Sequence, residues 1–336
     1  MAEGISVVIP VYNAATWQEP TVERISTALH QAGLRRKEAE IILVNDGSTD
    51  DSLAAARALQ SEYPIMVVDQ ENKGRFLARK AGLLVARKKF ILFIDSRVYI
   101  HEKSLQFVRE QLKKDASKVI WNGHVIVDKK GNIIARFGDA ITFLGWRRYF
   151  KNPHTCSYGL KDFDHYPKGT TLFFAPRQLL LDAVATFERQ TYNIKNSSDD
   201  THLIRLLACD HQINLSPQFS CTYHARTKLS QFFRHSYHRG CVFVDGFLRP
   251  GNRFFLPLIV FLAGSVTGIV AYGLVPALRM PIIIGLALAW FAELVGALLL
   301  GVGIKDALSL FVLSPLFALA YGFGIWRATV KTIGKI

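Results

Sequence analysis

Three long apolar segments in the last third of the chain restrict its fold more than any other feature. They cover residues 254–275, 281–301 and 307–326, and each is long enough to cross the roughly 30 Å hydrocarbon core of a bilayer as a helix. Because a water-soluble core rarely buries such segments, the sequence predicts a transmembrane domain over residues 254–336. We expect Glu293, an acid in the second segment, to meet a polar group inside the helix bundle.

The basic residues around these segments leave their topology open. Arg249 and Arg253 precede the first segment, and Arg327, Lys331 and Lys335 follow the third. Basic residues favour the cytosolic side, yet three crossings place these two groups on opposite sides. Either one segment is re-entrant, or the rule fails here. The net charge of +14 favours anionic lipid or pyrophosphate partners, and no recognition helix or RNA-binding signature indicates nucleic acid.

The first part of the chain alternates short apolar runs with helix-like stretches. The runs are "ISVVIPVY", "EIILVND", "IMVVDQ" and "FILFID". Strands that alternate with helices predict an α/β fold with a mostly parallel sheet covered on both faces. Such sheets bind ligands beyond the carboxyl ends of their strands, which is where Asn13, Asp46 and Asp95 lie.

The middle of the chain gives weaker signals. Residues 119–138 predict a β-hairpin that turns at Lys130-Gly131, and residues 169–184 predict a strand that leads into a helix. The stretch "NSSDDTHLIRLL" predicts a helix with polar residues at its start. The four cysteines show no CxxC spacing and no zinc-like pairing, so we expect reduced thiols.

Three segments resemble the first three motifs of the family 2 glycosyltransferases. They are "VVIPVYNAATWQEPTVERISTAL", "IILVNDGSTDDSL" and "ENKGRFLARKAGLLVA", in the family's order and spacing. The resemblance implies a GT-A fold and the inverting transfer of a sugar from a nucleotide diphosphate. It implies a catalytic domain over residues 1–230, followed by an amphipathic interface segment over 231–253 and the membrane domain.

The resemblance also implies which residues bind a UDP- or GDP-sugar. Asp46 matches the family position that hydrogen-bonds the base, and the cationic side chains suit the diphosphate. The donor-binding residues expected on this basis are Pro10, Tyr12, Asn13, Asp46, Lys73, Arg79, Asp95 and Arg97.

The segment "FIDSR" departs from the family's D-x-D motif. Asp95 matches the first acid, whereas Arg97 stands where the second, metal-coordinating acid belongs. A carboxylate can hold Mg²⁺ or Mn²⁺ against the departing diphosphate, whereas a guanidinium can pair with the phosphate itself. Three alternatives follow: Asp95 alone holds a metal, Arg97 partly replaces the metal, or the site binds a donor without catalysis. It also stays open that Arg97 only faces solvent.

Two later segments resemble further family motifs. In "NSSDDTHLIRLL" the second acid of the E-D motif, the general base, matches Asp200, and Asp199 takes the place of the glutamate. "QFFRHSYHRG" resembles the Q-x-x-R-W motif, with Gln231 and Arg234 toward acceptor and diphosphate and His235 in place of tryptophan. A basic amphipathic helix on anionic headgroups is the alternative for this segment.

Taken together, these features predict a multi-pass enzyme of the cell membrane with its catalytic domain in the cytosol. We expect it to transfer a sugar to a hydroxyl of a membrane-associated, lipid-linked acceptor, in the synthesis of cell-surface glycan or glycolipid. A polyprenyl-phosphate glycosyltransferase is the alternative enzyme. A catalytically inactive nucleotide-sugar-binding membrane subunit is the alternative outside the enzymes.

Overall fold

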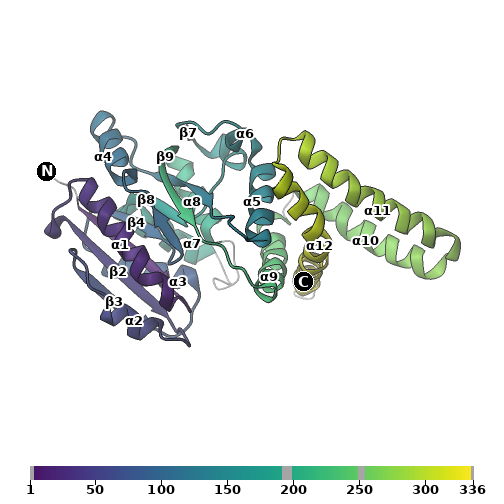
Figure 1. The fold of residues 1–336 in the computed structure, drawn as a ribbon, viewed down its shortest axis with the longest axis horizontal. Coiled ribbons are helices and arrows are strands. Elements are labelled where there is room, and N and C mark those ends of the chain that lie inside the picture. Colours follow the sequence, from purple (N-terminus) through teal and green to yellow (C-terminus); the bar gives the residue numbers. More distant parts are fainter. Residues whose placement is uncertain (1–3, 191–198, 249–253, 334–336) are drawn as a thin grey trace. The chain divides into compact units, whose positions relative to one another are not determined.

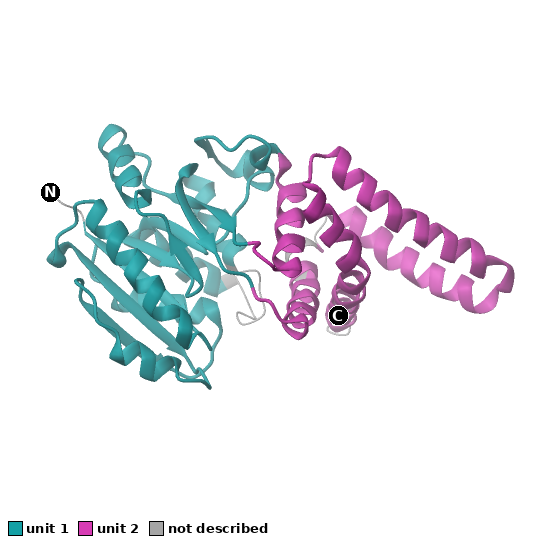
Figure 2. Ribbon diagram, viewed as in Figure 1, with its two compact units in different colours: residues 1–128, 148–195, 199–225 teal, residues 129–147, 196–198, 226–336 magenta. Residues whose placement is uncertain are grey.

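The computed structural model describes residues 4–190, 199–248 and 254–333, and the chain divides into two compact units (Figure 2). The first unit comprises residues 1–128, 148–195 and 199–225. The second comprises residues 129–147, 196–198 and 226–336. The units therefore interleave along the chain, because residues 129–147 leave the first unit for the second and the chain then returns.

The N-terminal half of the first unit is the predicted parallel sheet with crossover helices. Its strands run in the order β3-β2-β1-β4, and all three pairings are parallel. The elements are β1 (Ile5–Val11), α1 (Ala15–Gln31), β2 (Ala39–Asp46), α2 (Ser52–Ala58), β3 (Ile65–Gln70), α3 (Arg75–Val85) and β4 (Phe90–Ile94). The alternation of apolar runs and helices in the sequence is confirmed here.

The later strands make the sheet mixed rather than parallel throughout. After β4 the order continues β8-β6-β9-β5, with antiparallel pairings at β4–β8, β8–β6 and β9–β5, and β7 also pairs with β9. These elements are β5 (Val98–Ile100), α4 (Ser104–Lys114), β6 (Trp121–Val127), α6 (Arg147–Phe150), β7 (Cys156–Tyr158), β8 (Leu172–Pro176), α7 (Arg177–Gln190), α8 (Asp199–Asp210) and β9 (Ile213–Tyr223). Two short 3₁₀ helices occupy Arg36–Glu38 and Leu160–His165.

Helices cover both faces of the sheet (Figure 1). Buried side chains of α1 and α4, such as Ile25 and Leu105, form one core layer, and those of α3, α7 and α8 form the other. The helix α3 packs very closely: a Cβ at Gly82 would lie 2.3 Å from Val8 Cγ1. This close approach packs the second half of α3 directly against β1 and β2.

The predicted hairpin over residues 119–138 is wrong. Gly131 does form a turn with φ +62°, but β6 leads through it into helix α5 (Ile133–Gly145) instead of a second strand. Phe137 and Ala140 are buried one helical turn apart, a spacing that fits a helix and not an alternating strand. The hairpin prediction depended on the turn residues Lys130 and Gly131. The buried residues after them have the spacing of a helix, which that prediction did not take into account.

The second unit is helical throughout its described residues. Beside α5 it contains α9 (Leu229–Phe247), α10 (Phe255–Leu274), α11 (Pro276–Leu299) and α12 (Ile304–Ile333). The last three are long and apolar enough to cross a membrane. Glu293 of α11 accepts a 2.5 Å hydrogen bond from the Ser314 hydroxyl of α12, so the expected polar partner for this acid is present.

Candidate active site

Hydrogen bonds join the loops that follow β1 and β2. The Asn13 side chain accepts a 2.8 Å bond from the Thr49 amide, and the Ser48 hydroxyl accepts a 3.1 Å bond from the Asn13 amide. Asn13 has φ +50°, a left-handed conformation that asparagine tolerates better than most residues. The two loops therefore form one surface at the carboxyl edge of the sheet, with the Tyr12 side chain exposed there and Pro10 buried in β1.

Asp46 connects the end of β2 to the loop that starts α3. Its Oδ1 accepts bonds from the Gln70 side chain at 2.7 Å and the Lys73 amide at 2.9 Å, and its Oδ2 accepts from the Gly74 amide at 3.0 Å. An ionised carboxylate offers about four lone-pair directions, and among the residues that the structure describes only Gly74 bonds Oδ2, so one direction there is available to a ligand N–H. Asp46 thus shapes this loop, and it retains one acceptor position.

Gly47 is required by the same contact between loops. It has φ +65°, and a Cβ there would lie 2.5 Å from the Asn72 amide nitrogen. No other residue fits without displacing backbone, which explains a glycine after Asp46 in physical terms.

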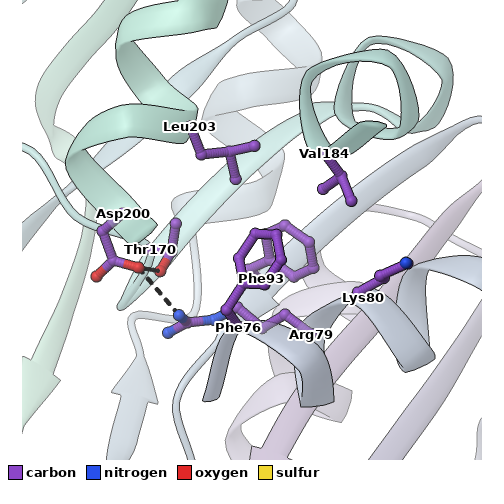
Figure 3. Close-up of a pocket in the computed structure, with 8 residues that line it drawn as sticks. All are labelled: Phe76, Arg79, Lys80, Phe93, Thr170, Val184, Asp200 and Leu203. Carbon is purple, nitrogen blue, oxygen red and sulfur yellow. Dashed lines mark hydrogen bonds and ion pairs between the residues drawn. The ribbon is translucent and has the colours of Figure 1, made fainter. Parts of the chain in front are cut away.

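A buried arginine links the two predicted acidic positions. Arg79, of which only 4% is exposed, donates to Asp95 Oδ1 at 2.6 Å and to Asp200 Oδ1 at 3.0 Å. The Thr170 hydroxyl also donates to Asp200 Oδ1, at 2.5 Å, and the Arg75 guanidinium lies 3.6 Å from Asp200 Oδ2. Figure 3 shows Asp200, Thr170 and the Arg79 guanidinium together at one end of a pocket. The structure therefore brings Arg79, Asp95 and Asp200 into one ion-pair network.

The network sets the charge state of Asp200. Burial by itself raises the pKa of this carboxyl group, but the charges of Arg75 and Arg79 and the bond from Thr170 outweigh burial and leave the pKa below its usual value. Asp200 is consequently ionised at neutral pH. An ionised, oriented carboxylate at the start of a helix is able to accept a proton from a hydroxyl.

Arg97 lies against an aromatic cluster after β4. Its guanidinium carbon is 5.3 Å from the centre of the Trp17 ring, and its carbonyl accepts a 3.0 Å bond from the His224 amide. The His224 ring stacks on Trp17 at 5.2 Å, and its Nδ1 lies 3.1 Å from Asp128 Oδ2. Since Trp17 belongs to the first turn of α1, this cation is held where the loops after β1 and β4 meet.

The described residues show no preformed side-chain cage for a divalent metal ion. Within residues 4–190, 199–248 and 254–333, no group of three histidine, cysteine or acidic side chains has a ligand-like arrangement. Asp95 already accepts a bond from Arg79, and the neighbouring position carries the cation of Arg97. Buried His224 Nε2 has no hydrogen-bond partner among the described residues, which makes it one further donor atom but not a cage.

Sequence reasoning missed several residues of this site. Thr170 gave no signal, because it precedes β8 and lies 30 positions from Asp200 in the chain. Arg75 stood inside the quoted third motif and could have been found there. Trp17 and His224 become meaningful only through their contact with Arg97. The rest of the pocket in Figure 3 is lined by Lys80 and by the apolar side chains of Phe76, Phe93, Val184 and Leu203.

The remaining predicted residues lie in other parts of the chain. Lys73 has an exposed side chain in the loop before α3. Asp199 is the first residue of α8, and its side chain lies outside the described part of the structure. Gln231, Arg234 and His235 lie on α9 in the second unit, where Arg234 and His235 are exposed. Their expected role toward an acceptor stays a prediction.

Comparison with known families and curated proteins matches the first half of the chain. Residues 6–169 match the model of the family described as "Glycosyl transferase family 2". Glycosyltransferase GlyG of Streptococcus pneumoniae is 36% identical over 135 residues, which are 39% of this chain and 43% of that protein. The minor teichoic acid biosynthesis protein GgaA of Bacillus subtilis is 34% identical over 107 residues, 31% of this chain and 23% of that protein. The matches thus span less than half the length of these relatives.

Solved structures share the fold at low sequence identity. S. aureus TarS 1-349 in complex with UDP-GlcNAc has a TM-score of 0.52 and 17% identity, over 97% of this chain and 89% of that one. The mannosyltransferase PcManGT from Pyrobaculum calidifontis, in complex with GDP-Man and Mn²⁺, has the same TM-score and identity over 98% and 87%. These similarities confirm the GT-A architecture.

Proposed function

The chain carries a glycosyl transferase family 2 domain with the GT-A fold, and on this premise we propose that it is an inverting glycosyltransferase of the membrane. The observation that carries the proposal is the Asp95–Arg79–Asp200 network at the carboxyl edge of β4. It holds an ionised carboxylate in a fixed position beside the loops that the fold uses for ligands. A binding subunit needs no such oriented base.

The donor is a nucleotide-diphosphate sugar bound at the edge formed by the loops after β1, β2 and β4. Neighbours in the fold bind UDP-GlcNAc and GDP-Man, so a UDP- or GDP-sugar suits this edge. The open lone pair of Asp46 Oδ2 is placed to accept an N–H of the base. Tyr12 and Asn13 border the same surface, and Lys73 supplies a cation near it.

Arg97 takes over the charge compensation that a metal ion gives in related sites. A guanidinium is always protonated and forms paired hydrogen bonds with phosphate oxygens. Stacking on Trp17 restricts its motion, so less conformational entropy is lost when the diphosphate binds. No step of the reaction as proposed here depends on a bound cation.

Asp200 accepts the proton of the acceptor hydroxyl as the oxygen attacks the anomeric carbon opposite the leaving diphosphate. Its lowered pKa keeps it ionised, and Arg79 and Thr170 fix its orientation. Asp199 precedes it in the position of the family's other acid. Because a phosphate acceptor is already anionic, the presence of a base favours a hydroxyl acceptor.

The acceptor is a lipid-linked molecule at the cytosolic face of the cell membrane, in the synthesis of cell-surface glycan or glycolipid. Three apolar helices support membrane association, and the relative GgaA is named for teichoic acid biosynthesis. Gln231, Arg234 and His235 on α9 are the residues proposed to meet the acceptor and the diphosphate. This placement follows from their position directly before the apolar helices.

One assay tests the proposal. Full-length protein in detergent is mixed with UDP- and GDP-sugars and a membrane lipid extract, and nucleotide release and donor binding are measured with and without EDTA. We expect Asp200→Asn to lose release at least about 100-fold while donor binding persists. Asp182→Asn, at an exposed position of α7, is the matched control and should leave release unchanged.

The outcomes separate the alternatives. Donor binding without release in the unaltered protein, whatever the lipid, would identify a binding subunit. Release that survives Asp200→Asn would refute the hydroxyl-acceptor mechanism. If the unaltered protein is active in EDTA, the role of Arg97 is supported, and Arg97→Asp should then make donor binding depend on Mn²⁺ or Mg²⁺. If the unaltered protein loses its activity in EDTA, the reaction requires a metal ion, contrary to the proposal.

A further inference from the structure

We propose that α12, although long and apolar enough to span, does not cross the bilayer. It lies obliquely in the membrane interface together with α5 and α9, and only the hairpin of α10 and α11 crosses. The inference concerns the second unit alone and does not depend on the reaction. It rests on burial, on the contacts of α12 along the hairpin, and on the charges of the helices that cover it.

The three apolar helices differ in how much of each is buried. In the most apolar window of α10 and of α11, 6% of residues are buried, whereas the figure for α12 is 33%. The hairpin thus offers apolar surface on nearly all sides, as a helix surrounded by lipid must. α12 is covered along much of its length by helices of its own unit, chiefly α5 and α9.

Contacts join α12 to the second half of α11 and to the middle of α10. Its first turns meet the last part of α11, where Phe311 stacks on Trp290 at 4.4 Å and Ser314 bonds Glu293. Its later turns meet the middle of α10, where the Trp326 indole donates to the Ser265 hydroxyl at 3.2 Å. A helix that crossed beside α11 would continue toward residue 276. Instead α12 passes from α11 over to α10.

Polar contacts mark both ends of α12 as lying outside the hydrocarbon. Near its start, Asp306 pairs with Lys129 at 2.8 Å and with Arg136 of α5 at 2.9 Å. Near its end, the Arg327 guanidinium donates to the Tyr237 hydroxyl of α9 at 2.5 Å. Both ends are therefore held by charged or polar groups from α5, the loop before it and α9, none of which is a candidate membrane span.

The helix α9 could not accompany α12 through a bilayer. The two backbones touch, because a Cβ at Gly240 would lie 2.1 Å from the Tyr321 carbonyl oxygen and one at Gly324 would lie 2.2 Å from that of Tyr237. α9 exposes Arg234 and Arg239 on its outer side. An arginine at the bilayer centre is strongly unfavourable, and an α12 that spanned the bilayer would place these two charges in the hydrocarbon.

The exposed surface of α12 fits an interfacial helix. Its exposed residues Leu308, Val312, Pro315, Leu319 and Phe323 follow one another at intervals of three or four positions. Such spacing forms a single stripe along one side of a helix. One apolar stripe, with the other sides covered, is the pattern of a helix that lies in the plane of the interface.

The proposal also resolves the distribution of basic residues. With three crossings, the seven basic residues after position 248 divide into four on one side and three on the other. With a hairpin alone, six lie on the side of the catalytic domain and only Arg279 lies at the tip, in accordance with the positive-inside tendency. The six are Arg249, Arg253, Lys305, Arg327, Lys331 and Lys335.

Labelling from one side of sealed vesicles tests the topology. Native Cys209, exposed in the first unit, reports the side of the catalytic domain. In variants whose other accessible cysteines are serine, Thr332→Cys reports the end of α12 and Ala277→Cys reports the hairpin tip, both at exposed positions. We expect a membrane-impermeant maleimide to label Thr332→Cys from the same side as Cys209 and Ala277→Cys from the opposite side. Labelling of Thr332→Cys from the side of Ala277→Cys would overturn the proposal.

Depth measurement gives an independent test with a matched pair. Leu286 and Leu319 are exposed leucines near the middle of α11 and α12, with 68% and 61% exposed. A spin label at Leu286→Cys should lie deep in the hydrocarbon, and one at Leu319→Cys should lie near the headgroups. Equal depth at the two positions would show that α12 spans, even if one variant used for labelling failed to fold.

Discussion

Replacement of Arg79 by methionine should destabilise the protein strongly, although the new side chain is no larger than the old one and nothing else is changed. Arg79 is 4% exposed, and its two partners Asp95 and Asp200 have side chains that are 17% and 22% exposed. Each charge-assisted hydrogen bond contributes about 1.5–3 kcal/mol, and loss of the cation leaves both carboxylates partly buried. Because some water reaches them and Arg75 remains near Asp200, we expect a loss of about 3 kcal/mol.

The neighbouring residue provides the matched control. Lys80 pairs with Glu188 at 2.6 Å from the same helix, but their side chains are 29% and 27% exposed. Such an accessible pair contributes at most about 1 kcal/mol. For a domain of this size 1 kcal/mol shifts Tm by about 2–4 °C, so Arg79→Met should lower Tm by about 6–12 °C and Lys80→Met by less than about 4 °C. Equal shifts would refute the argument from burial.

The pH dependence of Tm in the unaltered protein and in Arg79→Met gives a second test of the same network. The pKa of Asp200 is lowered in the folded protein, so its ion pairs contribute fully above its ordinary value and are lost as the pH falls through the folded value. Without Arg79, burial raises the pKa of this carboxyl group, and the variant takes up a proton earlier. The Tm difference between the two proteins should therefore narrow from pH 7.5 to 4.5. A difference that stays constant or widens would contradict this reading.

Further predictions follow from single contacts. Gly47→Ala should lower Tm and weaken the binding of UDP or GDP measured by titration, because the new Cβ would collide with the Asn72 backbone amide. The control is Gly131→Ala, at a position with a similar φ and open space around it. It should lower Tm less and leave nucleotide binding unchanged. Asp306→Asn should make the 129–147 segment more sensitive to limited proteolysis in detergent, because two ion pairs hold α5 to α12. Glu293→Leu should lower Tm in detergent by a few degrees, and Glu293→Gln, which keeps the acceptor for the Ser314 hydroxyl, should not.

The sequence predicted the parallel strands and their loops because those signals are local. Apolar runs of five to eight residues ended on polar residues, and the structure places Asn13, Asp46 and Asp95 at one edge as expected. The Arg79 network was not foreseen in this form, since its partners lie 16 and 121 positions away. Likewise, turn residues around Gly131 outweighed the helical period that follows, and α5 was predicted as a strand.

The charges of the site explain why Arg97 and a metal ion are alternative ways to neutralise the leaving diphosphate. Two carboxylates, Asp95 and Asp200, pair with the guanidinium groups of Arg75 and Arg79. Arg97, two positions after Asp95, adds a third cation against Trp17, so these five charges sum to plus one. Arg79 occupies Asp95 Oδ1, so a dication bound at Asp95 Oδ2 would lie close to the Arg79 guanidinium, and the two cations would repel each other. An anionic diphosphate faces no such penalty, because it meets cations already in place. Arg79, which orients the proposed base Asp200, therefore also disfavours a metal ion at Asp95. An arginine at position 97 can supply the positive charge that the metal ion would otherwise bring.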